Sequence, residues 1–267
     1  FILSALTITL YAAGALQQSL IYLRRIPPKH FISIVIGVSA TALHLLVTLK
    51  HTLLADAQYN LGLYNSASIV SLAVVTFILI LTHKKPMSSL LLGAYPFAAL
   101  SVLLLTLYDA PTNTTLRTDN GILLHIVLSI IAYSIFLIAA FQSILILAQD
   151  HNLKRKTHTV LTRNLPPLLT MEKLLFEMIW SGTILLGIAM VIGAVFIEDI
   201  FAQHLAHKTV LSIASLLVFS TLLFGRHRYG WRGVTASKLT LSGFALLMLG
   251  FFGSKFVLET LLSNSTH

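Results

Sequence analysis

Long apolar runs separated by short polar stretches make up nearly the whole chain. A helix needs about 20 apolar residues to cross a ~30 Å hydrocarbon core, and each run approaches or exceeds that length. The runs therefore predict transmembrane helices at residues 2–23, 32–50, 63–82, 89–107, 121–148, 174–198, 208–225 and 239–262. We expect an all-α polytopic membrane helix bundle of about eight transmembrane helices, forming a single integral membrane domain over residues 1–267.

Composition supports this reading over a water-soluble fold. Of the 267 residues, 56% are hydrophobic and 10% are charged, against roughly 25% charged in soluble domains. The first run has no basic stretch before it, and Arg24 and Arg25 follow it. That order is the reverse of a signal peptide, so we expect a retained helix.

The basic residues predict the orientation of the chain. Most of the 18 Lys and Arg residues fall in four alternate polar segments, after the first, third, fifth and seventh runs. Because cytoplasmic loops are enriched in Lys and Arg, these segments are predicted to face the cytoplasm. Eight spans then place both the N- and the C-terminus on the non-cytoplasmic side. The net charge of +9 is thus explained by short loops, and nucleic acid is not an expected partner.

Two histidines lie within apolar runs, where an ionisable side chain is costly and marks a functional site by default. At a rise of about 1.5 Å per residue, His44 lies roughly 9 Å below Lys50, at the outer end of its span. By the same rise His125 lies roughly 6 Å from the outer start of its own span. This matched depth suits a pair of ligands on neighbouring helices. The alternative is that each imidazole simply bonds a serine or a backbone carbonyl within the bundle.

Small and hydroxyl-bearing residues share a helix face with each of these histidines. Such residues let membrane helices approach closely and bond across the contact. At helical spacing the two faces are formed by Gly37, Ala40, Thr41 and His44, and by His125, Ser129, Ala132, Phe136 and Ala140.

A further polar cluster falls between the sixth and seventh runs. It consists of Glu198, Asp199, His204 and His207. Carboxylates and imidazoles together can bind a divalent metal, although a hydrated loop explains the same residues. From this loop His207 could reach His125. Cysteine is absent, so thiol chemistry is excluded. The sequence contains no nucleophile elbow, phosphate loop or HExxH motif, so no catalytic residue is predicted.

Several short motifs, in order and spacing, resemble the cytochrome c assembly proteins of the CcsA type, and within them the YpjD/HemX-like inner-membrane branch. The resemblance extends over residues 60–262. It is carried by Gly62-Leu63-Tyr64-Asn65-Ser66-Ala67-Ser68, by Leu124-His125-Ile126 with Ser129 and Ala132-Tyr133, by Gly230-Trp231-Arg232-Gly233 with Gly243-Phe244, and by Gly253-Ser254-Lys255.

The resemblance implies a haem-handling, multi-pass protein of the bacterial inner (plasma) membrane, with haem as its cofactor. It matches His125 to the first of the family's outer haem-binding histidines. Two features of the family are missing. Residues 197–208 contain no tryptophan where a WWD segment is expected, and the last run ends in Leu261 and Leu262 without a second outer histidine.

Two functions follow as hypotheses. The first is a haem-binding protein with His125 and His44 as iron ligands and His207 as a further haem contact. The second is a non-enzymatic scaffold or regulator that keeps the fold without haem and acts on membrane protein partners through residues 149–173 and 226–232. The lipid bilayer is a partner in both. A small-solute transporter is disfavoured because no inverted repeat or pair of broken helices is visible.

Overall fold

The computed structural model describes residues 1–27, 30–53, 59–85, 87–108, 115–116, 120–155, 165–196 and 203–253. These residues contain eight α-helices. The chain divides into two compact units. The first unit comprises residues 1–117 with 156–166, and the second comprises residues 118–155 with 167–267.

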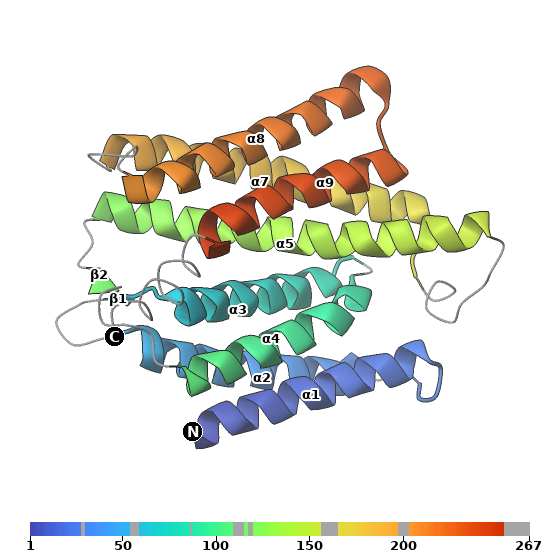
Figure 1. Ribbon diagram of the computed structural model, residues 1–267. Coiled ribbons are helices and arrows are strands. Elements are labelled where there is room, and N and C mark those ends of the chain that lie inside the picture. Colours follow the sequence, from blue (N-terminus) through green and yellow to red (C-terminus); the bar gives the residue numbers. More distant parts are fainter. Residues whose placement is uncertain are drawn as a thin grey trace. The chain divides into compact units, whose positions relative to one another are not determined.

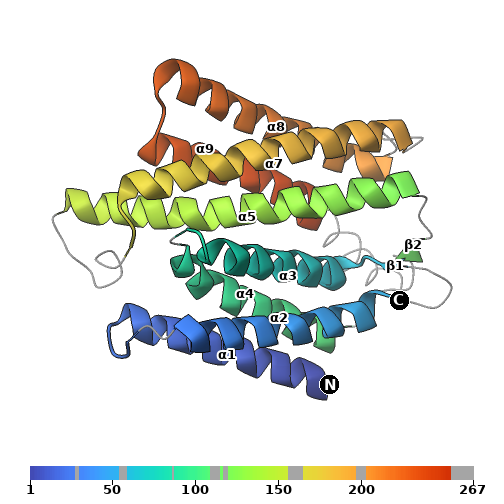
Figure 2. The same cartoon turned by 180° about the vertical axis from the view of Figure 1, so that it is seen from behind.

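The first unit is a bundle of four long helices. Its elements are α1 (Ile2–Tyr22), α2 (His30–Thr52), α3 (Leu63–Thr82), the short 3₁₀ helix η2 (Ser88–Leu90) and α4 (Leu91–Leu107). Helix α1 packs along α2 and α4, and α3 packs on the other side of α4 (Figures 1 and 2). A two-residue ribbon adjoins the bundle, in which β1 (Tyr59–Asn60) pairs antiparallel with β2 (Thr115–Leu116).

The second unit is built around α5 (Asn120–Lys154), which packs against α7 (Leu168–Phe196) and α9 (Gly233–Met248). Helix α8 (Gln203–Tyr229) covers α9 and α7, and a π-helical turn, η4 (Leu249–Gly253), continues α9 (Figure 1). In the core, the rings of Phe136 and Phe219 stack at a centroid distance of 3.9 Å. Glycines flank this stack, Gly182 against Phe136 and Gly243 against Phe219.

Seven helices in the described part of the chain are long and apolar enough to cross a membrane. Helix α1, with 21 residues, is not among these seven. The all-α polytopic membrane bundle expected from the sequence is therefore confirmed. The sides on which the termini lie, the single domain over 1–267 and the assembly-like region over 60–262 stay predictions.

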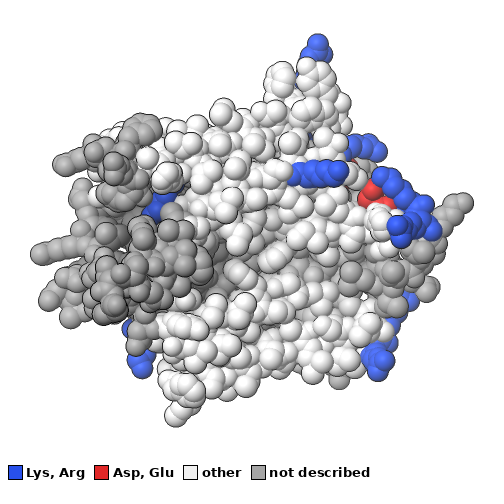
Figure 3. Space-filling model, in the orientation of Figure 1, with Lys and Arg blue, Asp and Glu red and all other residues white. Residues whose placement is uncertain are grey.

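The outward faces of the helices suit a lipid environment. Large apolar side chains such as Leu16, Ile80, Val191 and Leu217 are exposed along their lengths. Figure 3 shows an uncharged surface over most of the helices, with Lys and Arg side chains gathered near helix ends. These helices contact the bilayer directly, because exposed apolar side chains are solvated by lipid tails.

The structure extends several helices beyond the predicted spans. Helix α5 continues to Lys154 through a polar stretch, and its last turn is closed by an ion pair of 2.7 Å between Lys154 and Asp150. Helix α7 starts at Leu168, directly after Pro167. Hydropathy identifies the part of a helix that lies in lipid. The helix can continue through polar residues because its backbone hydrogen bonds do not depend on apolar side chains.

Candidate functional site

His125 is fixed by a hydrogen bond to a neighbouring helix of the second unit. Its Nδ1 lies 2.6 Å from the carbonyl oxygen of Ala189 on α7. A carbonyl can only accept, so Nδ1 carries the proton and donates. This bond holds the imidazole of α5 in one orientation against α7.

A glycine one turn further along α7 makes room for the ring. A Cβ on Gly193 would lie 2.8 Å from both Nδ1 and Cε1 of His125, closer than such atoms approach. The absent side chain exposes the Ala189 carbonyl to a group from outside its own helix. At the same end of the pair, Gly121 of α5 receives the ring of Phe196 of α7.

The hydrogen bond to Ala189 leaves the lone pair on Nε2, the second ring nitrogen of His125. Because Nδ1 is the donor, Nε2 carries the lone pair, and among the described residues it makes no hydrogen bond. Histidines that ligate metals typically donate their other ring N–H to a carbonyl or carboxylate, which fixes the tautomer. A histidine held in this way can offer Nε2 to a ligand.

His44 has a different environment in the first unit. It is fully buried on α2, with 0% of its surface exposed. Its Nδ1 lies 3.0 Å from the hydroxyl of Tyr11 on α1, and its Nε2 lies 2.9 Å from Oγ of Ser68 on α3. Ser68 in turn bonds Oγ1 of Thr48 at 2.8 Å.

Both ring nitrogens of His44 are thus engaged, and the residue links three helices. One ring nitrogen donates and the other accepts in the neutral imidazole, and hydroxyls can serve either role. Ligation of iron by His44 requires that Tyr11 or Ser68 first give up its bond. Both histidines therefore make the bonds expected under the alternative to a ligand pair: His44 bonds a serine and His125 bonds a backbone carbonyl.

The other predicted site residues are placed only in part. His207 lies near the start of α8 in the second unit and is exposed. Glu198, Asp199 and the side chain of His204 lie outside the described residues. Within the described ranges, no group of three or more His, Asp or Glu side chains could hold a metal ion. The pairing of His125 with His44, which belongs to the other unit, stays a prediction.

Sequence reasoning missed the partners of both histidines. Ala189 and Gly193 form a small-xxx-small pair, a pattern that marks close helix contacts and was available as a signal. Ser68 ends the Gly62–Ser68 motif that carries the family resemblance, but the resemblance did not identify Ser68 as the partner of His44. Tyr11 had no distinguishing signal, since tyrosine is common in membrane helices.

The fold and these histidines define a multi-pass membrane protein whose helix interfaces hold imidazole groups. The model of the family described as "Cytochrome C assembly protein" matches residues 32–262, and the chain belongs to that family.

Three relatives illustrate the similarity. The Inner membrane protein YpjD of Escherichia coli K12 is 32% identical over 202 residues, which are 76% of each chain. A 28.8 kDa protein of Azospirillum brasilense is 36% identical over 141 residues, and Protein HemX of Brevibacillus brevis is 27% identical over 142 residues; each match spans 52% of both chains. No solved structure matches the chain.

These findings confirm the resemblance inferred from the motifs. Together with the membrane-length apolar helices, they make the protein a multi-pass protein of the bacterial inner membrane. Membership of the family supports a haem-related assembly role in general terms.

Proposed function

We propose that the protein binds haem in the inner membrane as part of cytochrome c assembly, and that Nε2 of His125 would hold the iron. The observation that carries the proposal is the 2.6 Å bond from Nδ1 of His125 to the Ala189 carbonyl. Family membership supports the choice of haem over other ligands of imidazole.

The chain contributes orientation and basicity to this site. The carbonyl of Ala189 accepts a hydrogen bond from the Nδ1–H group and so increases electron density at Nε2. Gly193 keeps the contact short enough for that bond. When bound, haem supplies an iron that accepts the Nε2 lone pair. The second ligand stays a prediction, with His44 and His207 as the candidates from the sequence.

The test is a haem titration of the purified full-length protein followed by its visible spectrum. The wild type is expected to shift the Soret band of added haem, and His125→Ala is expected to lose that shift. His151→Ala is the matched control, because His151 is an exposed histidine on the same helix, α5. His44→Ala and His207→Ala in the same assay show whether either supplies the second ligand.

The alternative function is a scaffold that keeps the fold without haem. The turn between α8 and α9 favours it, since Arg226 lies 4.7 Å from the ring centre of Phe176 and donates to the Trp231 carbonyl at 3.3 Å. This ordered turn exposes Arg228 and Arg232 for a partner. A wild-type protein that leaves the Soret band of haem unshifted would establish the scaffold reading. An unchanged shift in His125→Ala would place the ligand elsewhere.

A further inference from the structure

The turn that ends α1 carries an arginine at a position that usually holds glycine. Beyond Tyr22, the N–H of Arg25 donates to the carbonyl of Leu20 at 2.9 Å, and the N–H of Arg24 donates to that of Ile21 at 3.0 Å. These two bonds define a Schellman motif, whose residue after the cap adopts the left-handed conformation. Arg24 occupies that place, with φ of +54°.

A side chain is unfavourable at this position because its Cβ crowds the following carbonyl oxygen. Among the described residues, Arg24 is the one non-glycine residue with positive φ. Strained backbone of this kind concentrates at functional sites. The arginine side chain is therefore a candidate for a functional role at a position where glycine would fit the backbone better.

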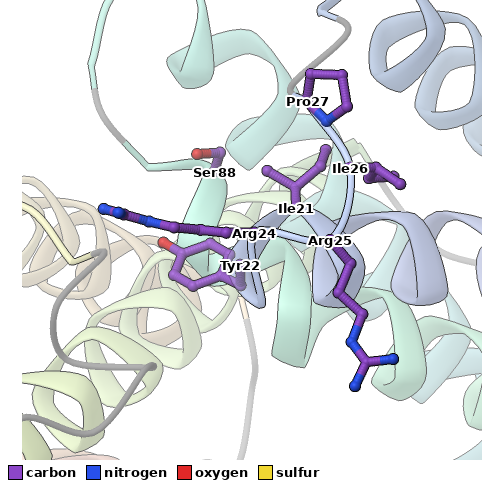
Figure 4. A pocket seen from close by; sticks show the side chains of 7 residues that line it. All are labelled: Ile21, Tyr22, Arg24, Arg25, Ile26, Pro27 and Ser88. Carbon is purple, nitrogen blue, oxygen red and sulfur yellow. The ribbon is translucent and has the colours of Figure 1, made fainter.

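A hollow of about 500 Å³ opens beside the turn, within the first unit. Its polar lining comes from Arg24, Arg25, Tyr22 and Ser88, and its apolar lining includes Ile26 and Pro27. In Figure 4 the guanidinium of Arg24 and the ring of Tyr22 extend to the same side of the turn as Ser88, whereas Arg25 extends away from them.

These groups have the chemistry of a phosphate site with an apolar border. A guanidinium binds phosphate oxygens through paired N–H donors, and hydroxyls add further donors. The hollow lies at the end of α1, in the basic segment predicted to face the cytoplasm, where anionic headgroups attract Lys and Arg. The apolar wall can contact the glycerol and first acyl carbons of a lipid, whereas it offers no favourable contact to a free phosphate ion.

We propose that this hollow binds the phosphate of an anionic phospholipid headgroup, with the Arg24 guanidinium as its main donor. The proposal goes beyond haem handling and does not depend on it. The competing explanation is that Arg24 only orients the chain and meets the negative end of α1.

Native mass spectrometry of the full-length protein with added lipid separates the two explanations. The wild type is expected to retain phosphatidylglycerol in preference to phosphatidylcholine. Arg24→Gly removes the guanidinium and supplies the residue that the turn prefers, so the fold is kept. It should retain phosphatidylglycerol about tenfold less well, the effect of losing one hydrogen bond between charged groups. Arg24→Asn, which also tolerates the left-handed conformation, should behave alike.

Arg228→Gln is the matched control, because it removes one exposed basic charge from the end of α8. It is expected to retain phosphatidylglycerol as the wild type does. Equal retention of both lipids by the wild type, or unchanged retention in both Arg24 variants, would overturn the proposal. So would a loss in Arg228→Gln equal to that in the Arg24 variants. Displacement of the lipid by inorganic phosphate alone would reassign the site to a soluble anion and overturn the lipid assignment.

Discussion

Three glycines of α7 meet three different surroundings, and each has a distinct consequence. Gly182 lies under the ring of Phe136, and Gly193 lies under the ring of His125. A Cβ at Gly187 would meet no atom within 4 Å. Substitutions on this one helix can therefore compare two glycines that allow a ring to lie close to the backbone with one glycine that has open space beside it.

Gly193→Ala is expected to displace the His125 ring and break its bond to the Ala189 carbonyl. A lost buried hydrogen bond costs about 0.5–1.5 kcal/mol, and overpacking adds about 1–3 kcal/mol. Thermal unfolding in detergent should therefore show a lower midpoint, and the Soret shift of added haem should weaken.

Gly187→Ala is the control on the same helix, and it should be neutral or stabilising by up to about 1 kcal/mol, since alanine has the higher helix propensity. If the two alanine variants have the same midpoint of thermal unfolding, the close contact between Gly193 and His125 does not contribute to stability.

Ser68→Ala tests the network around His44. The change removes the bonds to Nε2 of His44 and to Thr48, leaving a buried ring nitrogen without its partner. An unsatisfied buried polar group costs about 1–3 kcal/mol, although bonds between membrane helices average nearer ~0.6 kcal/mol. Chemical unfolding should show a loss within that range.

Thr76→Val on the same helix provides the comparison, because the Thr76 hydroxyl bonds only the Leu72 carbonyl of its own helix at 2.7 Å. A larger loss in Thr76→Val than in Ser68→Ala would contradict the interhelical role assigned to Ser68.

At the level of elements, the second unit is held by aromatic rings set against glycines. Phe136 of α5 and Phe219 of α8 stack with an interplanar angle of 8°. Gly182 of α7 and Gly243 of α9 allow the rings to lie against their backbones. In addition, Oγ of Ser215 donates to the Gly243 carbonyl at 2.8 Å, which ties α8 to α9.

Gly243→Ala should disturb this stack, because the new methyl carbon would lie 2.8 Å from Cζ of Phe219. We expect a destabilisation of about 1–3 kcal/mol from overpacking. Combining it with Phe219→Leu should recover part of the loss, measured as the midpoint of thermal unfolding. If the loss in the double variant equals the sum of the two single losses, the ring and the glycine do not act on each other.

The helices were largely predictable from sequence, and their ends were not. Burial in lipid requires an apolar run, so hydropathy locates each crossing. The continuation of α5 to Lys154 depends on backbone bonds and one ion pair, which leave no apolar signal. His125 and His44 were likewise recognisable as imidazoles in apolar runs. The carbonyl of Ala189 was not, because every residue carries one and only the packing selects it.

For the whole molecule, the absence of cysteine allows the orientation in the membrane to be tested directly. Single cysteines can be introduced as unique labels and treated with a membrane-impermeant maleimide. Lys50→Cys and Asn120→Cys should react in intact spheroplasts, whereas Lys84→Cys and Arg228→Cys should react only after lysis. These results follow from the placement of basic loops in the cytoplasm.

Phe1→Cys tests the eighth crossing, since α1 is not among the seven helices that are long and apolar enough to cross a membrane. Labelling from outside the cell would establish that α1 spans the bilayer. Labelling only after lysis would leave α1 on the cytoplasmic side and reduce the count of spans to seven.

The 35 residues of α5 measure about 52 Å at 1.5 Å per residue, whereas a bilayer with its headgroups is about 40–45 Å thick. In the predicted orientation, with its start near the outer headgroups, the helix is long enough to reach past the lipid into water on the cytoplasmic side. The height of its Lys154 end above the membrane is set by helix geometry, and deleting one turn of α5 would lower that end by about 5.4 Å.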